Sequence, residues 1–337
     1  MRTGQWVMAA VMGGASLAAA AQTIRPAGAE RLQAAQLALV VNDAEPDSIA
    51  VAELYRKAHH VPEANIVHVR IPGKPRRLSA RYFAELRQEI DAQLPPQTRA
   101  ILMVWTAPYA VECNSITSAM SNGFDADQCS KPCGPGKPTA FFDAPQLANV
   151  RLSMLLPIDT PELARHVIER GATRTFSLPK AGAYFLNTSD QARSSRARFF
   201  PPSGVVRQKE VTIYNRNADV LEGVQDIMLY HTGLVRVPKL DTLRFLPGAL
   251  ADHLTSTGGD LLGDAQMSSL QWLQAGATAS YGTVSEPCNY WQKFPQSTVL
   301  LKQYLSGRTA IEAYWSSVAW PAQGLFIGDP LAAPYAR

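Results

Sequence analysis

The sequence lacks a strong excess of charge of either sign. Its 337 residues carry 32 Lys and Arg against 28 Asp and Glu, a net charge of +4. So small an excess argues against a nucleic-acid partner, because binding a phosphate backbone requires a concentrated basic surface. The one compact basic cluster, Lys74, Arg76, Arg77 and Arg81, precedes an expected helix, and we interpret it as a solvated loop.

A long apolar run is absent after the N-terminus, so we expect no transmembrane helix there. At the N-terminus, Arg2 is followed by the apolar stretch Trp6–Leu17 and by alanines up to Ala21. This order is typical of a secretory signal peptide, and the stretch is short for a membrane span. We therefore expect residues 1–21 to be removed near Ala21, leaving a periplasmic or secreted protein without stable membrane insertion. An uncleaved N-terminal anchor is the alternative.

Cysteine is scarce, with four residues in the chain. An oxidising compartment favours disulfides, and four cysteines allow three pairings. The paired Cys-x-x-Cys knuckles of most structural zinc sites are missing, so we expect disulfides rather than zinc, and neither a metal nor a cofactor. Cys129 and Cys133 are close in the sequence, whereas Cys113 and Cys288 each follow an expected strand. We therefore predict the bridges Cys129–Cys133 and Cys113–Cys288.

Short apolar runs alternate with helical patterns along the first hundred residues. Strands are expected at Leu37–Val41, Ile66–Ile71 and Ala100–Trp105, with helices beginning at Pro46 and Tyr82 between them. This β-α-β-α-β order predicts an α/β fold, a mostly parallel sheet flanked by helices.

The middle of the chain is less regular, and the last third returns to α/β order. Thr106–Pro145 is expected to be a long loop. Further strands are expected at Ala183–Leu186, Glu210–Tyr214, Asp226–Tyr230, Thr278–Val284 and Leu325–Ile327, and helices at Pro161–Arg170, Ser268–Gln274, Val299–Leu305 and Ile311–Val318. No domain boundary is visible, so we expect a tether over residues 22–36 and a single α/β domain over residues 37–337.

Several short strings of the sequence, taken together, carry a resemblance to a known family. They are Val40-Val-Asn-Asp43, His59-His-Val-Pro62, Ala251-Asp-His-Leu-Thr-Ser256, Ala275-Gly-Ala-Thr278, Tyr281-Gly-Thr-Val-Ser-Glu-Pro-Cys288 and Ile327-Gly-Asp-Pro-Leu331. With them the chain resembles, over nearly all of its length after the expected signal, an uncharacterised family of exported bacterial proteins. That family is found mainly in genomes encoding an exosortase, the membrane enzyme of a protein-sorting and exopolysaccharide-linked system. The resemblance implies an accessory or binding role there, with an envelope protein or a polysaccharide as partner.

The order of elements in the second half resembles caspase-like peptidases, including gingipain-like and CHAT-type domains. In that fold a histidine follows one parallel strand and the nucleophilic cysteine follows the next. His231-Thr-Gly233 resembles the histidine motif, but the segment at the nucleophile position, Leu254–Gly258, contains no cysteine. The resemblance therefore implies a caspase-like second half without cysteine-peptidase activity.

Polar residues follow several of the expected strands. They are Asn42, Asp43, Asn187, Asp190 and Glu286. Because ligands of open parallel sheets collect at the carboxyl ends of the strands, these residues and His231 are candidates for one binding cleft. Carboxylates beside an imidazole also suit general acid–base chemistry. Helix caps and turns are the alternative for Asp43, Asn187 and Asp190.

A second histidine, His253, is the other candidate base. Ser256 or Ser280 would be its nucleophile, although no Gly-x-Ser-x-Gly elbow is present and a structural histidine is the alternative. Two functions stay open: a non-catalytic extracytoplasmic accessory or binding protein, and a hydrolase with a nonstandard site at the strand ends. The hydrolase requires His231 or His253 within hydrogen-bond reach of Ser, Thr or Cys in a cleft. We favour the first, because no nucleophile–base pair stands out in the sequence.

Overall fold

The computed structural model describes residues 1, 31–138, 150–173 and 180–336, so residues 2–21 of the expected signal peptide and its cleavage site lie outside the described residues. The strands are β1 (Leu37–Asn42), β2 (Ile66–Val69), β3 (Arg77–Leu78), β4 (Ala100–Val104), β5 (Ala110–Val111), β6 (Asn114–Ser115), β7 (Leu152–Leu156), β8 (Ala181–Asn187), β9 (Gly204–Val206), β10 (Val211–Asn217), β11 (Ile227–Thr232), β12 (Phe245–His253), β13 (Ala279–Thr283) and β14 (Gly324–Gly328). The α-helices are α1 (Pro46–His59), α2 (Ala80–Gln93), α3 (Ile116–Asn122), α4 (Ala126–Ser130), α6 (Pro161–Ala172), α7 (Leu270–Ala275), α8 (Ser297–Leu305) and α9 (Ala310–Ser317).

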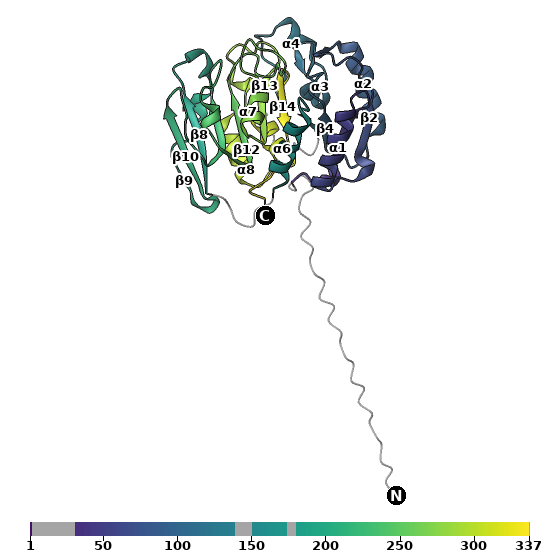
Figure 1. Ribbon diagram of the computed structural model, residues 1–337, viewed down its shortest axis with the longest axis horizontal. Coiled ribbons are helices and arrows are strands. Elements are labelled where there is room, and N and C mark those ends of the chain that lie inside the picture. The colour runs from purple at the N-terminus through teal and green to yellow at the C-terminus, as the bar shows by residue number, and fades with distance from the viewer. Residues whose placement is uncertain (2–30, 139–149, 174–179, 337) are drawn as a thin grey trace.

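One large sheet runs through the molecule, in the order β2-β1-β4-β7-β14-β13-β12-β11-β8-β10-β9. Figure 1 shows β2 and β4 towards one end of the sheet and β8, β9 and β10 at the other. The pairs β13–β14 and β10–β9 are antiparallel, and the other neighbours in this sheet are parallel. Helices flank the sheet, so the α/β fold predicted from the alternation of elements is confirmed. The strand β14, near the C-terminus, lies in the middle, between β7 and β13.

The central strands carry the core. Every residue of β1, β4 and β7 is buried, as expected for parallel strands that are covered on both faces. The helix α6 begins at a Thr160 cap, whose side chain accepts a hydrogen bond from the Leu163 amide, with Pro161 in its first turn. At the start of the described chain, Leu32 is buried and its amide donates to Glu312 at 3.1 Å. This end of the expected tether is therefore packed against α9.

Three strands of the sheet were not expected from the sequence. They are β7, the short edge strand β9, and β12, whose Pro247 and Gly248 are ordinary turn signals. Gly248 has a φ of +85°, and the pairing of β12 with β11 shifts between Ile227 and Leu229. The strand therefore contains an irregularity that a glycine can adopt, and only its second part, which leads to His253, is fully buried.

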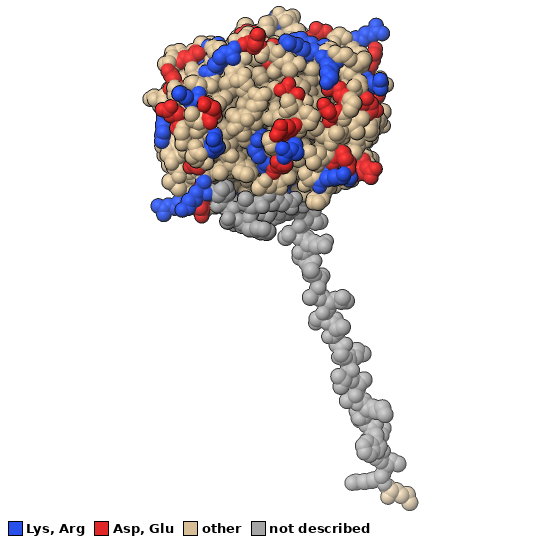
Figure 2. Space-filling view, viewed as in Figure 1, with Lys and Arg blue, Asp and Glu red and all other residues tan. Residues whose placement is uncertain are grey.

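The surface mixes both signs of charge. Figure 2 shows Lys and Arg side chains interspersed with Asp and Glu over the viewed face. Among the residues that the structure describes, no helix has the length and apolar character needed to cross a membrane. Two disulfides indicate an extracytoplasmic compartment.

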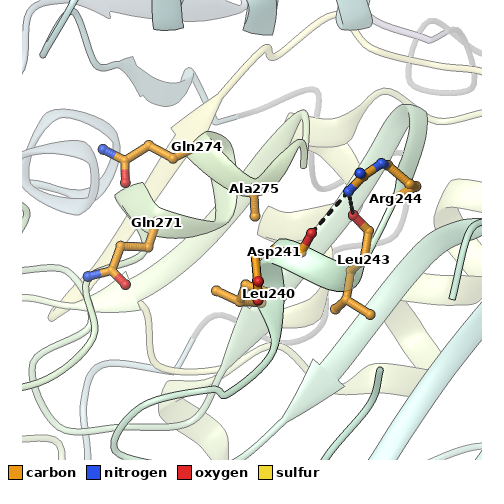
Figure 3. A pocket seen from close by; sticks show the side chains of 7 residues that line it. All are labelled: Leu240, Asp241, Leu243, Arg244, Gln271, Gln274 and Ala275. Atoms are coloured by element: carbon orange, nitrogen blue, oxygen red, sulfur yellow. Dashed lines mark hydrogen bonds between the residues drawn. The ribbon is translucent and has the colours of Figure 1, made fainter. Parts of the chain in front are cut away.

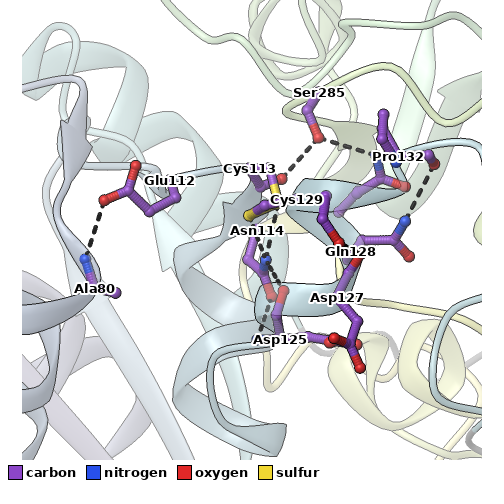
Figure 4. The surroundings of a disulfide bond; sticks show 12 residues. Ala80, Glu112, Cys113, Asn114, Asp125, Asp127, Gln128, Cys129, Pro132 and Ser285 are labelled. Carbon is purple, nitrogen blue, oxygen red and sulfur yellow. Dashed lines mark hydrogen bonds between the residues drawn. A yellow bond between two sulfur atoms is a disulfide. The ribbon is translucent and has the colours of Figure 1, made fainter.

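The four cysteines form disulfides, but the predicted pairing is wrong. The bridges are Cys113–Cys129, with Cα atoms 5.3 Å apart, and Cys133–Cys288, with Cα atoms 5.2 Å apart. The expected loop over Thr106–Pro145 contains α3 and α4. These helices fold the chain back, so that Cys129 lies beside Cys113 (Figure 4).

Asn114, which precedes α3, is hydrogen-bonded to the residue that precedes α4. Its side chain donates to the Asp125 carbonyl at 3.0 Å and accepts from the Asp125 amide at 3.0 Å. This contact sets Cys129, on α4, against Cys113. The chain then leads Cys133 towards the loop after β13, where the Lys293 ammonium donates to the Pro132 carbonyl at 2.5 Å. Cys133 therefore meets Cys288, far away in the sequence.

Candidate functional site

The histidine of the His-Thr-Gly string lies beside an aspartate of the next strand. His231 is on β11 and Asp252 is on β12, and the parallel register pairs these two residues directly. Their side chains therefore extend from the same face of the sheet. The His231 Nε2 atom lies 2.9 Å from the Asp252 Oδ2 atom. Sequence reasoning placed His231 at a strand end but did not identify Asp252 as its partner.

A buried arginine holds the other oxygen of this carboxylate. Arg196 comes from the segment between β8 and β9, and its Nη1 atom lies 2.5 Å from Asp252 Oδ1. Its Nη2 group donates to the backbone carbonyls of Thr232, at 3.0 Å, and Asp252, at 3.2 Å. The guanidinium therefore neutralises Asp252 and joins the ends of β11 and β12.

A serine completes the network on the far side of the imidazole. Ser297, the first residue of α8, has its Oγ atom 2.7 Å from His231 Nδ1. Because Nε2 faces a carboxylate, we assign the ring proton to Nε2, which leaves Nδ1 to accept from the Ser297 hydroxyl. Serine, histidine and aspartate thus stand in the order of the hydrolase triad, but the two ring nitrogens are exchanged, because in the triad Nε2 faces the serine and Nδ1 faces the aspartate.

Burial sets the chemistry of this network. His231, Asp252 and Ser297 are 0% exposed and Arg196 is 1% exposed. Burial, outweighing the attraction of Asp252, lowers the pKa of His231, so the imidazole is neutral near pH 7. Burial alone would raise the pKa of Asp252, but Arg196 and His231 outweigh it and the pKa is lowered. A hydrolase requires a histidine that is hydrogen-bonded to a hydroxyl group in a cleft. His231 has this hydrogen bond to Ser297, but both side chains are buried rather than in a cleft.

The segment Asp190–Phe200, here named the covering segment, closes the site. A Cβ atom at Gly233 would lie only 2.0 Å from the Arg193 carbonyl oxygen, so the glycine lets the two backbones touch. The Arg193 side chain also donates to the Thr255 hydroxyl at 3.1 Å. The covering segment therefore lies directly on the carboxyl ends of β11 and β12, where a substrate would have to enter.

The second candidate base has a different neighbour from the one expected. His253 follows Asp252 in β12 and so points to the opposite face of the sheet. Its Nδ1 atom accepts a hydrogen bond from the Trp272 indole at 2.9 Å. No hydrogen bond joins it to Ser256 or Ser280 in the described part of the chain. Ser280 is fully buried and Ser256 half-buried. This arrangement favours the structural reading of His253.

The burial of His253 makes the stability depend on pH. Burial is the largest cause that lowers its pKa, from an ordinary 6.5 to about 4. The unfolded chain therefore takes up this proton more readily than the folded one, and stability falls as the pH drops from about 6.5 towards 4. We expect His253 to account for about 3 kcal/mol of the loss in unfolding free energy over that range.

Denaturant unfolding at several pH values between 7.5 and 4.5 measures this effect. A His253→Gln variant should show a shallower decline than the natural protein. A His166→Gln variant, changed at an exposed position, should follow the natural protein. Equal slopes for all three proteins would show that His253 does not control the decline.

The polar residues expected to share one cleft lie apart. Between β1, which carries Asn42, and β8, which carries Asn187, the sheet order places β4, β7, β14, β13, β12 and β11. At about 4.8 Å per strand, the two asparagines are roughly 34 Å from each other. The structure therefore does not bring these residues together in one binding site.

Each of these residues has a local partner instead. Asn42 is buried in the turn before α1, where its side chain donates to Glu45 at 3.0 Å. Asp43 lies 2.8 Å from the exposed His68 imidazole. Asn187 donates to Asn217 at 3.0 Å, Asp190 accepts from the Arg193 amide at 3.2 Å, and Glu286 accepts from the Cys288 amide at 2.8 Å. The alternative of caps and turns fits Asp190, which caps the 3-10 turn Gln191–Arg193. Asp43 and Asn187 instead pair with residues of neighbouring strands, β2 and β10.

The two residues missed by sequence reasoning, Arg196 and Ser297, belong to no local motif. Arg196 stands in a segment rich in Ser and Arg, and Ser297 follows Pro295 at a helix start, as many serines do. Neither position carries a signal that separates it from its neighbours. Within the described ranges, no group of three or more His, Cys, Asp and Glu residues is arranged to hold a metal ion.

No family model matches the sequence, and no curated protein matches it. One solved structure, described as "Structure of Protease", aligns with a TM-score of 0.46 and 10% sequence identity. The alignment covers 89% of this chain and 78% of that chain. A likeness of this strength establishes neither a family nor an activity.

Proposed function

We propose that this protein is a non-catalytic accessory or binding protein that acts outside the cytoplasm. Its context is the exosortase- and exopolysaccharide-linked system that the sequence resemblance implies, and export includes removal of residues 1–21. The observation that carries the proposal is the closure of the Ser297–His231–Asp252 network, whose members are 0% exposed. Because no substrate can reach His231 and Ser297, these residues stabilise the core and do not carry out a reaction.

The chemistry of the network supports the same conclusion. In a triad, the aspartate stabilises the imidazolium that forms during catalysis. Here the Asp252 carboxylate is already paired with Arg196 at 2.5 Å, and a neighbouring cation opposes a second positive charge on His231. The network is therefore better suited to joining β11, β12 and α8 than to moving a proton.

The position of a caspase-like nucleophile is also unsuited to catalysis. All four cysteines are in disulfides, so no thiolate is available. The segment Leu254–Gly258 is tied to β13, because the Thr283 hydroxyl donates to the Ser256 carbonyl at 2.9 Å. The neighbouring Gly259 amide donates to the Thr283 carbonyl at 2.8 Å. These bonds hold the segment closed against the end of β13.

A hydrolase is the second candidate, and one observation favours it. The spacing of 2.7 Å from Ser297 to His231 and 2.9 Å from His231 to Asp252 is that of an activated serine. For this function the covering segment would have to leave the strand ends and take Arg196 with it. The two candidates therefore differ in whether Ser297 ever becomes reactive.

Labelling with a fluorophosphonate, a reagent for activated serines, distinguishes them. We expect the oxidised protein without its signal peptide to gain no mass after prolonged incubation at pH 7.5, because Ser297 is enclosed. Intact-mass spectrometry checks this result, with the Ser297→Ala variant as the matched control. Labelling of the natural protein that disappears in Ser297→Ala would overturn the proposal and establish the hydrolase.

A further inference from the structure

A separate pocket lies beside α7, away from the buried network. It has a volume of about 440 Å³ and is open to solvent between α7 and the short 3-10 turn η6 (Leu240–Thr242). Figure 3 shows the residues that line it: Leu240, Asp241, Leu243, Arg244, Gln271, Gln274 and Ala275. The pocket is shallow, so a ligand there would be held against one face rather than enclosed. We propose that the pocket binds a neutral saccharide unit, an inference that rests on the proposed binding function.

Two glutamines form the side of the pocket on α7. Gln271 and Gln274 are three positions apart, so they lie on the same face of the helix, and Figure 3 shows them extending from the same side. Both residues are exposed, and their side-chain amides bond to no other described residue. Each amide therefore offers two donors and one acceptor to a ligand.

The opposite side of the pocket carries one cation and one anion. The Arg244 Nη1 group donates to the backbone carbonyls of Asp241, at 3.1 Å, and Leu243, at 2.9 Å (Figure 3). These bonds fix the guanidinium in place and leave its other N–H groups available. The Asp241 side chain is exposed and makes no hydrogen bond to the described part of the chain. Its carboxylate is therefore available as an acceptor.

This set of groups fits a hydroxylated, uncharged ligand. Asp241 would repel an anion and Arg244 would repel a cation, so a strongly charged ligand is disfavoured. A hydroxyl group can donate to Asp241 and to the amide oxygens, and it can accept from Arg244 and the amide N–H groups. Leu240 and Ala275, which are partly exposed, supply a small apolar surface for the C–H face of a sugar ring. A saccharide combines both kinds of surface in one ring.

The test measures the binding of neutral oligosaccharides built from glucose, galactose, mannose and N-acetylglucosamine. Isothermal titration calorimetry gives the Kd, and NMR of the side-chain amides locates the contact. For an oligosaccharide that binds, we expect the amide signals of Gln271 and Gln274 to shift. The double variant Gln271→Ala/Gln274→Ala should bind at least about tenfold more weakly, since it loses two hydrogen-bonding groups. Gln208→Ala, changed at another exposed glutamine, should bind as the natural protein does.

The outcomes separate this inference from the function on which it rests. Unchanged affinity in the double variant would show that saccharide binds elsewhere, and this pocket assignment would be wrong. No binding of any member of the panel to the folded natural protein would refute the saccharide inference. Neither result bears on serine labelling, which tests the non-catalytic function independently. Both glutamines are exposed, and an unchanged unfolding midpoint confirms that the double variant is folded.

Discussion

Replacement of Arg196 by Met is expected to lower the free energy of unfolding by about 3–5 kcal/mol, because it removes one partner of a buried ion pair. Arg196 is 1% exposed and Asp252 is 0% exposed, so water cannot take the place of the guanidinium. The Asp252 carboxylate would be left with a neutral imidazole as its neighbour. Denaturant unfolding of the purified, oxidised protein measures the change.

Arg198→Met is the matched control, two residues further along the same segment. Arg198 is exposed, and its guanidinium lies 5.6 Å from the centre of the Phe199 ring. An exposed contact of this kind contributes at most about 1 kcal/mol. A double variant, Arg196→Met with Asp252→Asn, should be less destabilised than the sum of its single changes, because it removes both charges. If Arg196→Met unfolds at the same denaturant concentration as Arg198→Met, the buried pair does not stabilise the fold.

Removal of the long-range disulfide should destabilise the protein more than removal of the short-range one. Cys133–Cys288 closes a separation of 155 residues, whereas Cys113–Cys129 closes one of 16 residues. The entropy of loop closure gives about 5 kcal/mol for the first and about 3 kcal/mol for the second. The two double Cys→Ser variants can be compared in one denaturant series without reductant. Equal losses, or the reverse order, would contradict the chain-entropy account.

Much of the α/β framework could be predicted from the sequence, because its parallel strands are continuous apolar runs. The runs at Leu37–Val41 and Ala100–Trp105 became β1 and β4, and the helix between them begins at Pro46 as expected. The strand β12 was missed because Pro247 and Gly248 interrupt its pattern. The pairing of β14 with β7 and β13 joins segments that are far apart in the sequence. Local hydrophobic periodicity does not encode such a pairing.

The candidate site was predicted only at its histidine. A His-Thr-Gly string after an apolar run could be read locally, and it correctly placed His231 near the end of a strand. Its partners, Arg196, Asp252 and Ser297, come from three other segments and meet only through the register of β11 with β12 and the packing of α8. The cysteine pairing failed for a related reason, since it depends on the return of the chain through α3 and α4.

The position of β14 in the middle of the sheet has a consequence for how the chain is made and moved. Until residues 324–328 are available, β7 and β13 are open edges, and the two parts of the sheet have no strand to join them. A nascent chain cannot complete this fold while residues 324–328 are still inside the ribosome. Until then its sheet is incomplete, and an incompletely folded polypeptide is suitable for threading through a translocation channel.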